Sequence, residues 1–211
     1  MNYRAVLFDF GGVFTSSPFH AVNNFASKND IDVQTFANTI FGQYGVDGDH
    51  PWHQVERGEI SLETARELIL ELGKEQGFEA DIYSVFAVMG EDGGGPRQQL
   101  ADYAIELADR GLITACVTNN IKEFGDGWKS MFDTGRMFNH IIDSSHEGVR
   151  KPEARIFEIA LERASVDAAE ALFLDDFAGN VEAAEQLGIN SILVTADEQK
   201  TLADLKATLG V

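Results

Sequence analysis

The sequence is poor in basic residues and has almost no cysteine, and both shortages narrow what the chain can do. Its 211 residues include 16 Lys and Arg against 35 Asp and Glu, which gives a net charge of −19. Contacts with nucleic acids or anionic membranes need clustered basic side chains, so we expect no nucleic-acid partner and no membrane partner. The one cysteine, Cys116, cannot form a disulfide within the chain and is expected to be a buried small apolar residue. A reducing, cytoplasmic compartment is therefore expected.

Long apolar runs are also missing. No stretch approaches the roughly 20 apolar residues that a membrane-spanning helix needs. The first four residues lead directly into a strand-like segment and lack the form of a signal peptide. A composition with 44% hydrophobic and 24% charged residues is typical of a folded globular chain, and the length predicts one domain or one domain with an insertion.

Short apolar runs alternate with helical patterns in most of the chain. The runs cover residues 5–8, 112–117, 140–143, 171–174 and 191–194. Helical periodicity covers residues 97–110, a segment that begins at Pro152, and about 179–187. This alternation predicts an α/β fold, a Rossmann-like parallel sheet with helices on both faces.

The segment between the first and second strands differs, because it carries helical patterns without strands. We expect residues 16–95 to form an all-helical cap, inserted into an α/β catalytic core made of residues 1–15 and 96–211. The run Gly93-Gly94-Gly95-Pro96 is interpreted as a hinge or linker at the end of this insertion.

Polar residues stand at the ends of the predicted strands or in the loops that follow them: Asp9, Thr118, Lys151, Asp175 and Asp176. An open parallel sheet places its ligand site at these ends. A carboxylate can accept a phosphoryl group as a nucleophile, while Lys and hydroxyl donors hold phosphate oxygens and carboxylates bind Mg²⁺. The set therefore indicates phosphoryl transfer.

In order and spacing these motifs resemble the haloacid dehalogenase superfamily of hydrolases, most of which are phosphatases. Within it, Phe10-Gly11-Gly12-Val13 and residues 52–61 look like the branch related to the N-terminal phosphatase domain of soluble epoxide hydrolase. The matching segments are residues 7–13 (LFDFGGV), 117–120 (VTNN), 150–153 (RKPE) and 173–181 (FLDDFAGNV).

The resemblance implies a role for each matching residue. Asp9 is expected to be the nucleophile, with Thr118, Asn119 through its backbone, and Lys151 holding the phosphate. The expected Mg²⁺ ligands are Asp9, Asp175, Asp176 and the backbone carbonyl of Gly11. Asn180 is expected to orient the acidic loop.

One position departs from the phosphatase pattern. The family's second Asp, which acts as general acid and base, is replaced by Gly11. A positioned proton donor is worth about 10²–10⁴-fold in rate, so we expect either a substrate with a good leaving group or a donor from elsewhere. His20 is the nearest titratable candidate in sequence.

Each of these residues also has a purely structural explanation. Asp9 before two glycines could be a turn former, and Asp175 with Asp176 could cap the next helix. Two adjacent acids at a strand end repel each other, however, unless a cation lies there. Trp52 is named as a specificity candidate, although packing in the cap core is the more common role for a tryptophan.

The function expected from these observations is Mg²⁺-dependent hydrolysis of a small phosphorylated metabolite through an aspartyl-phosphate intermediate. Two alternatives stay open: a non-catalytic phosphate-binding or regulatory protein, suggested by Gly11, and a 2-haloacid dehalogenase. The acidic pair Asp175-Asp176 argues against the second. The sequence does not identify the substrate or the oligomeric state.

Overall fold

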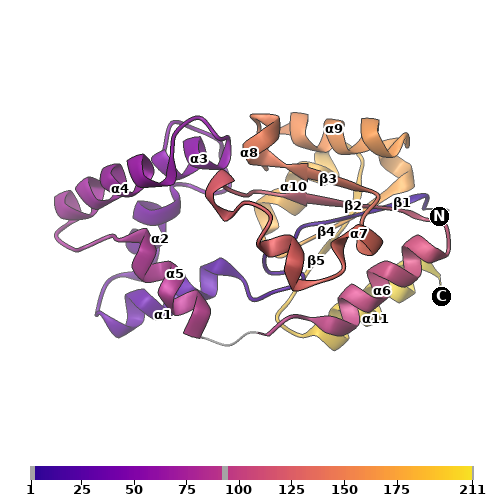
Figure 1. Ribbon diagram of the computed structural model, residues 1–211, viewed down its shortest axis with the longest axis horizontal. Helices are drawn as coiled ribbons and strands as arrows, with labels where there is room; N and C mark the ends of the chain where they lie inside the picture. The colour runs from indigo at the N-terminus through magenta and orange to yellow at the C-terminus, as the bar shows by residue number, and fades with distance from the viewer. Residues whose placement is uncertain (1–2, 92–94, 211) are drawn as a thin grey trace.

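The computed structural model describes residues 3–91 and 95–210, with a group of helices at one end and a parallel sheet at the other (Figure 1). The sheet has the strand order β3-β2-β1-β4-β5, and all four neighbouring pairs are parallel. This confirms the predicted α/β class. The strands are β1 (Ala5–Phe8), β2 (Ile113–Thr118), β3 (His140–Asp143), β4 (Ala171–Asp175) and β5 (Asn190–Leu193).

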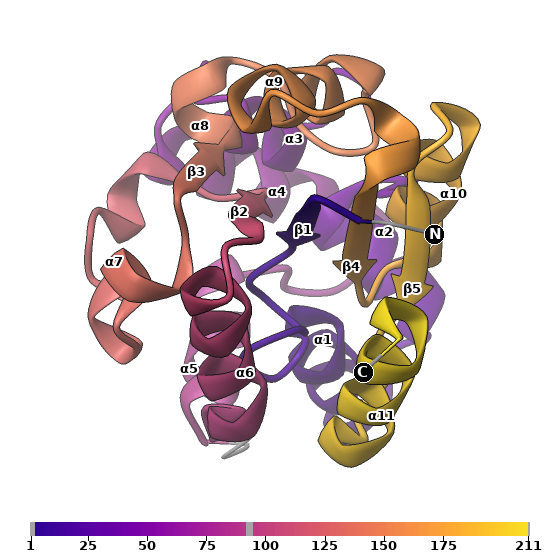
Figure 2. The same ribbon diagram turned by 90° about the vertical axis from the view of Figure 1, so that its right-hand side faces the viewer.

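The central strands are apolar throughout because helices cover both of their faces. Val6 and Phe8 of β1 pack on one side, and Ala5 and Leu7 pack on the other. The first side is covered by α6 (Gln98–Asp109), α7 (Thr134–Met137) and α11 (Glu198–Leu209), and the second by α9 (Ala154–Ala164) and α10 (Ala178–Gln186) (Figure 2). Short elements complete this part of the chain: α8 (Ser144–Glu147), η1 (Lys122–Phe124), η2 (Trp128–Met131) and η3 (Ala168–Glu170).

Within the described residues between β1 and α6, five helices build a third hydrophobic cluster beside the two of the sheet, and we call them the cap. Fully buried side chains of Val22, Phe36, Ile40 and Ile69 lie at its centre. The predicted division of the chain at residues 15–16 and 95–96 stays a prediction, and part of the predicted glycine hinge lies outside the described residues. The cap helices are α1 (Pro18–Lys28), α2 (Val33–Phe41), α3 (Pro51–Glu56), α4 (Leu62–Gln76) and α5 (Ile82–Glu91).

The helix expected from Pro152 begins two residues later, at Ala154. The backbone N–H of Glu153 donates to the carbonyl of Arg150 at 2.9 Å, so Pro152 lies in a turn that precedes the helix. Cys116 is fully buried in β2, as expected. In the part of the chain that the structure describes, no helix is both long and apolar enough to cross a bilayer.

Candidate active site

Three carboxylates meet at the carboxyl ends of β1 and β4, which are neighbours in the sheet. Phe8 lies opposite Leu174 in the register, and the N–H of Asp9 continues the ladder by donating to the carbonyl of Leu174 at 2.8 Å. The residues that follow the paired positions therefore lie side by side. One carboxylate oxygen each from Asp9, Asp175 and Asp176 lies within 4.8 Å of the others.

Lys151 places a positive charge between two of these acids. Its side chain is 1% exposed, and its ammonium Nζ lies 2.8 Å from Asp9 Oδ1 and 2.7 Å from Asp175 Oδ2. Burial alone would lower the pKa of Lys151, but the carboxylates of Asp175 and Asp9 raise it above its ordinary value. The lysine is therefore a fixed cation rather than a proton donor.

One lysine does not balance three acids, and the surplus negative charge raises the pKa values of two of the carboxyl groups. Burial raises the pKa of Asp9 to about 7, and the charges of Asp175 and Asp176 add to the rise although Lys151 opposes it. Burial, followed by the charge of Asp175, raises the pKa of Asp176 to about 6. A clustered set of oxygen ligands with excess negative charge fits a hard divalent cation such as Mg²⁺.

The carboxylate of Asp175 is held in one orientation by its neighbours. It accepts hydrogen bonds from the backbone N–H of Phe177 at 2.8 Å and from Asn180 Nδ2 at 3.0 and 3.2 Å. Asn180 is 2% exposed and lies in the first turn of α10. The amide thus lies where the resemblance placed it, against the acidic loop.

Gly11 and Gly12 have different steric requirements. Gly12 has φ +74°, and a Cβ added there would lie 2.1 Å from the carboxyl carbon of Asp176, so any other residue would strain the backbone and displace the Asp176 side chain. At Gly11 an added Cβ would meet nothing closer than Pro18 Cδ, at 3.8 Å. The absence of the family's second acid is therefore not forced by crowding around the Cβ position.

In the second motif, the hydroxyl of Thr118 makes one weak contact, whereas the side-chain amides of Asn119 and Asn120 make short hydrogen bonds. Thr118 lines the cavity at Asp9, and its hydroxyl makes only a long contact of 3.5 Å, to the carbonyl of Asn119. Asn119 accepts from the backbone N–H of Lys151 at 2.8 Å and donates to the Lys151 carbonyl at 3.0 Å. Asn120 donates to Asp143 Oδ2 at 2.7 Å. The side chain of Asn119 thus holds the lysine loop, which leaves its backbone for the predicted phosphate contact.

Two adjoining cavities surround this cluster. The smaller, about 50 Å³, is lined by Asp9, Thr118 and the acidic loop of β4. The larger, about 330 Å³, we call the apolar chamber, and it adjoins the first because Gly11, Tyr44 and other residues line both. Aromatic and methionine side chains dominate its walls: Phe10, Phe19, Phe41, Trp52, Phe86, Met89, Phe124, Trp128 and Met131.

The two remaining candidates, Trp52 and His20, differ in their relation to the cavities. Trp52 is 7% exposed, packs in the cap core and also lines the apolar chamber, while its role in specificity stays a prediction. His20 is exposed on α1 and lines a surface pocket with Arg97 and Asp176, and Asp176 also lines the cavity at Asp9. It lines neither of the cavities at Asp9.

Residues of the cap that reach the site were not found by sequence reasoning. Tyr44 lines both cavities, and Glu56, only 2% exposed, lines the apolar chamber. Tyr44 lies between two cap helices, and no motif surrounds it. Glu56 falls within residues 52–61, which carry the resemblance, but no role was assigned to it. A further signal was the basic pair Arg150-Lys151, because a second buried cation needs an acidic partner.

Comparisons with known proteins show the family to which the chain belongs. A sequence model of the haloacid dehalogenase-like hydrolase family matches residues 3–188. The chain is 27% identical to the sesquiterpene phosphatase of Aspergillus oryzae, over 99% of this chain and 98% of that protein. Two mouse relatives are much longer. Acyl-CoA dehydrogenase family member 10 is 32% identical over 99% of this chain, and bifunctional epoxide hydrolase 2 is 34% identical over 50% of it. The chain covers 19% and 20% of their lengths.

A solved structure shares the fold over nearly the whole chain. It is an enzyme of the same family from Bacteroides thetaiotaomicron, at 20% identity and a TM-score of 0.66, with 96% of this chain and 99% of that chain covered. The same enzyme has been solved with magnesium and inorganic phosphate, at 21% identity and a TM-score of 0.62, with coverage of 92% and 96%.

Proposed function

Since the chain belongs to the haloacid dehalogenase-like hydrolases, we propose that it is a Mg²⁺-dependent phosphatase that works through an aspartyl phosphate on Asp9. The observation that carries the proposal is the position of Lys151 between Asp9 and Asp175, beside a third carboxylate. A nucleophilic carboxylate, a fixed cation and a set of metal ligands are the parts that phosphoryl transfer needs.

The residues divide the reaction between them. A carboxylate oxygen of Asp9 forms a bond to phosphorus, and the bond from phosphorus to the substrate oxygen breaks, its electron pair leaving with an alkoxide that takes a proton from solvent water. A second water then attacks the phosphorus of the aspartyl phosphate and loses a proton to solvent, which releases inorganic phosphate and restores Asp9. Lys151 and the hydroxyl of Thr118 hold the equatorial oxygens in both steps. A Mg²⁺ held by Asp9, Asp175, Asp176 and the Gly11 carbonyl would supply charge neutralisation.

The missing acid at Gly11 determines which esters react fast. The departing oxygen receives no proton from residue 11, and His20 borders neither cavity at Asp9. We therefore expect the rate to depend strongly on the acidity of the leaving alcohol, with aryl phosphates hydrolysed faster than alkyl phosphates.

The substrate class follows from the apolar chamber. Its volume, about 330 Å³, falls at the lower end of the roughly 300–1,000 Å³ typical of small-ligand sites. Its aromatic and methionine walls suit a hydrocarbon group better than a sugar, since a buried hydroxyl without a partner is costly. The name of the Aspergillus relative, a sesquiterpene phosphatase, supports the same class. The proposed substrate is a monophosphate ester of an apolar alcohol.

A series of straight-chain alkyl phosphates tests both parts of the proposal. Each buried methylene contributes about 0.8 kcal/mol, so kcat/KM should rise about fourfold per carbon until the chamber is full. The Asp9→Asn variant should lose turnover while its melting temperature stays close to that of the wild type. Full activity in Asp9→Asn would contradict the mechanism, and a flat response to chain length, with sugar phosphates preferred, would contradict the substrate class.

Gly11 also favours a second candidate, a phosphate-binding or regulatory protein without turnover. It predicts that inorganic phosphate with Mg²⁺ raises the melting temperature while no ester is hydrolysed. Hydrolysis that disappears in Asp9→Asn would exclude it.

A further inference from the structure

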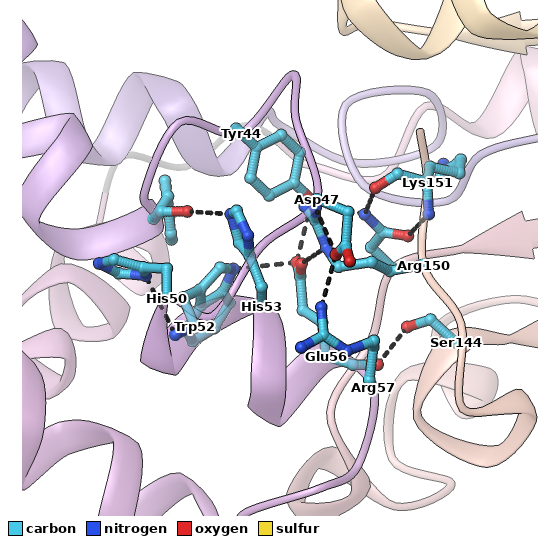
Figure 3. A network of polar contacts seen from close by, with 12 residues as sticks. Tyr44, Asp47, His50, Trp52, His53, Glu56, Arg57, Ser144, Arg150 and Lys151 are labelled. Atoms are coloured by element: carbon cyan, nitrogen blue, oxygen red, sulfur yellow. Dashed lines mark hydrogen bonds and ion pairs between the residues drawn. The ribbon is translucent and has the colours of Figure 1, made fainter. Parts of the chain in front are cut away.

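A buried ion pair joins the cap to the loop that carries Lys151 (Figure 3). The Nε of Arg150 donates to Glu56 Oε2 at 2.7 Å, across 94 positions of the sequence. The Arg150 side chain is 0% exposed and that of Glu56 is 3% exposed. Glu56 is the last residue of α3 in the cap, whereas Arg150 directly precedes Lys151 in the core. The pair therefore crosses the boundary between cap and core beside the candidate active site.

The other oxygen of the Glu56 carboxylate is also fully used. Glu56 Oε1 accepts from the Tyr44 hydroxyl at 2.9 Å and from the indole Nε1 of Trp52 at 2.9 Å (Figure 3). Its backbone carbonyl accepts from the Ser144 hydroxyl at 2.7 Å, a second link between cap and core. Hydrogen bonds thus hold Glu56 at its carboxylate and at its backbone carbonyl, and the carboxylate in turn holds the Tyr44 hydroxyl in place.

Tyr44 carries the connection from Glu56 to the phosphate side of the site. Its hydroxyl accepts from Asn119 Nδ2 at 3.2 Å, and the Asn119 amide is the group that holds the N–H and the carbonyl of Lys151. The guanidinium of Arg150 lies 4.7 Å from the centre of the Tyr44 ring, so the same tyrosine also contacts the residue before Lys151.

The ring of Tyr44 also packs against a third core loop and against a cap helix. Its centroid is 5.1 Å from that of Phe177, which directly follows the acidic pair, and 5.1 Å from that of Phe19 on α1. One side chain of the cap thus contacts residues in or next to the second, third and fourth motifs. A residue needed only for cap stability would not require contacts with three loops of the core.

We propose that Tyr44 and Glu56 are positioning residues that make the placement of Lys151 depend on cap docking. Two routes run from the Glu56 carboxylate to the lysine, one through Arg150 and the other through Tyr44 and Asn119. A docked cap completes both routes and holds the ammonium group at Asp9 and Asp175. The inference rests on the proposed function only in taking Lys151 as a phosphate ligand.

The sharpest test removes one oxygen atom and compares the result with an equivalent removal elsewhere in the cap. Tyr44→Phe deletes the hydroxyl between Glu56 and Asn119. Tyr83→Phe is its matched control, because the Tyr83 hydroxyl donates to Glu63 at 3.0 Å on the cap surface, away from both cavities. The measurements are the dissociation constant of inorganic phosphate in the presence of Mg²⁺, and kcat and KM for p-nitrophenyl phosphate.

We expect Tyr44→Phe to weaken phosphate binding and to lower kcat, each by at least about tenfold, because small displacements of a charged ligand are costly in such sites. KM should change less than kcat, since the chamber still binds the organic group. Tyr83→Phe should stay within about twofold of the wild type on every measurement. Tyr44→Phe values that match those of Tyr83→Phe would overturn the proposal.

A second pair of variants separates positioning from stability. Glu56→Gln keeps the shape of the side chain but removes the nearer of the two acids that pair with Arg150, because only Asp47, 3.6 Å from the guanidinium, remains. Glu63→Gln is the matched control. We expect Glu56→Gln to weaken phosphate binding by at least about tenfold at temperatures where circular dichroism shows it to be folded. A lower melting temperature with unchanged phosphate affinity would assign the pair to stability alone and would overturn the inference.

The binding measurement keeps the two proposals apart. If the wild-type protein hydrolyses no ester, the proposed function fails, while the phosphate affinity of Tyr44→Phe still decides whether the tyrosine positions Lys151. If the wild-type protein does not bind phosphate with Mg²⁺ at all, both proposals fall.

Discussion

Affinity for Mg²⁺ should depend steeply on pH, because the metal competes with protons for the same carboxylates. The pKa of Asp9 is raised to about 7 and that of Asp176 to about 6 by burial and by the neighbouring acids. Both groups are ionised at pH 8 and both are protonated at pH 5. Two protons must therefore leave before the metal binds at the lower pH.

The size of the effect follows from these two values. At pH 5 a group of pKa about 7 is ionised in about 1% of molecules and one of pKa about 6 in about 10%, so the apparent dissociation constant should rise about 10³-fold between pH 8 and pH 5. This corresponds to about 4 kcal/mol of binding free energy. Since the two carboxyls share their neighbours, the total number of protons is predicted rather than the order in which they leave.

The quantity to measure is the difference between the metal-bound and the metal-free protein, because other titrating groups change the stability of the fold with pH in the opposite direction to Asp9 and Asp176. A carboxyl group whose pKa is higher in the folded than in the unfolded protein favours the fold most when it is protonated. Asp9 and Asp176 therefore make the metal-free fold less stable as the pH rises from about 4 to about 7. Burial lowers the pKa of His50 and His53 to about 4, so these imidazoles make the fold less stable as the pH falls from 6.5. These two effects on stability overlap in pH, and only the pH dependence of metal binding reports on the candidate site alone.

Titration calorimetry at pH 5, 6, 7 and 8, in buffers of different ionisation enthalpy, yields both the affinity and the number of protons released. Release should approach two at pH 5 and zero at pH 8. Asp176→Asn should reduce the release at pH 5 to about one proton, whereas Asp81→Asn, which removes an acid paired with Arg66 in the cap, should leave the profile unchanged. An affinity that varies by less than tenfold between pH 5 and pH 8 would refute the reasoning.

Three further substitutions test separate parts of the site. Gly12→Ala should lower the free energy of unfolding by about 1–2 kcal/mol, because the backbone there is left-handed, and should weaken Mg²⁺ binding by displacing Asp176. Gly77→Ala is the control, since Gly77 has φ +88° and an added Cβ would meet nothing within 4 Å, so calorimetry should show unchanged metal affinity. Gly11→Asp should raise kcat for alkyl phosphates about 10²-fold and change aryl phosphate turnover little, and equal gains for both would contradict the leaving-group argument. Trp128→Ala, in the chamber wall, should lower kcat/KM for long-chain esters more than for short ones, and a uniform loss would show that the chain does not bind there.

The sheet and the acidic cluster could be predicted because their signals are local. Each strand is a short apolar run, and each chemical residue comes at its carboxyl end, so a parallel sheet brings Asp9 next to Asp175 once the two strands are neighbours. Lys151 is farther from its strand, at the end of a loop after α8, and its place depended on the order of motifs in the family. The structure brings these residues together, while their roles in catalysis stay predictions.

The contacts between cap and core could not be predicted, because the burial of a polar residue depends on its distant partner. Glu56 is the last residue of the short helix α3, and a glutamate there would be classed as solvent-exposed from its own segment. It is buried only because Arg150 arrives from another part of the chain and supplies the opposite charge. Tyr44 lies in a loop between two cap helices, and no periodicity indicates which way its ring points.

Substitutions of the residues at the acidic cluster and of those around the chamber should affect activity in different ways. Asp9, Asp175 and Lys151 act directly on the proposed reaction, so their loss removes activity whatever the substrate is. The chamber walls come from both cap and core, and Tyr44 comes from the cap, so the effects of substitutions there depend on the organic group and on whether the cap is docked. A comparison of Tyr44→Phe on short and long alkyl phosphates therefore discriminates between them: a loss of kcat shared by all chain lengths places the defect at Lys151, whereas a loss that grows with chain length places it in the chamber.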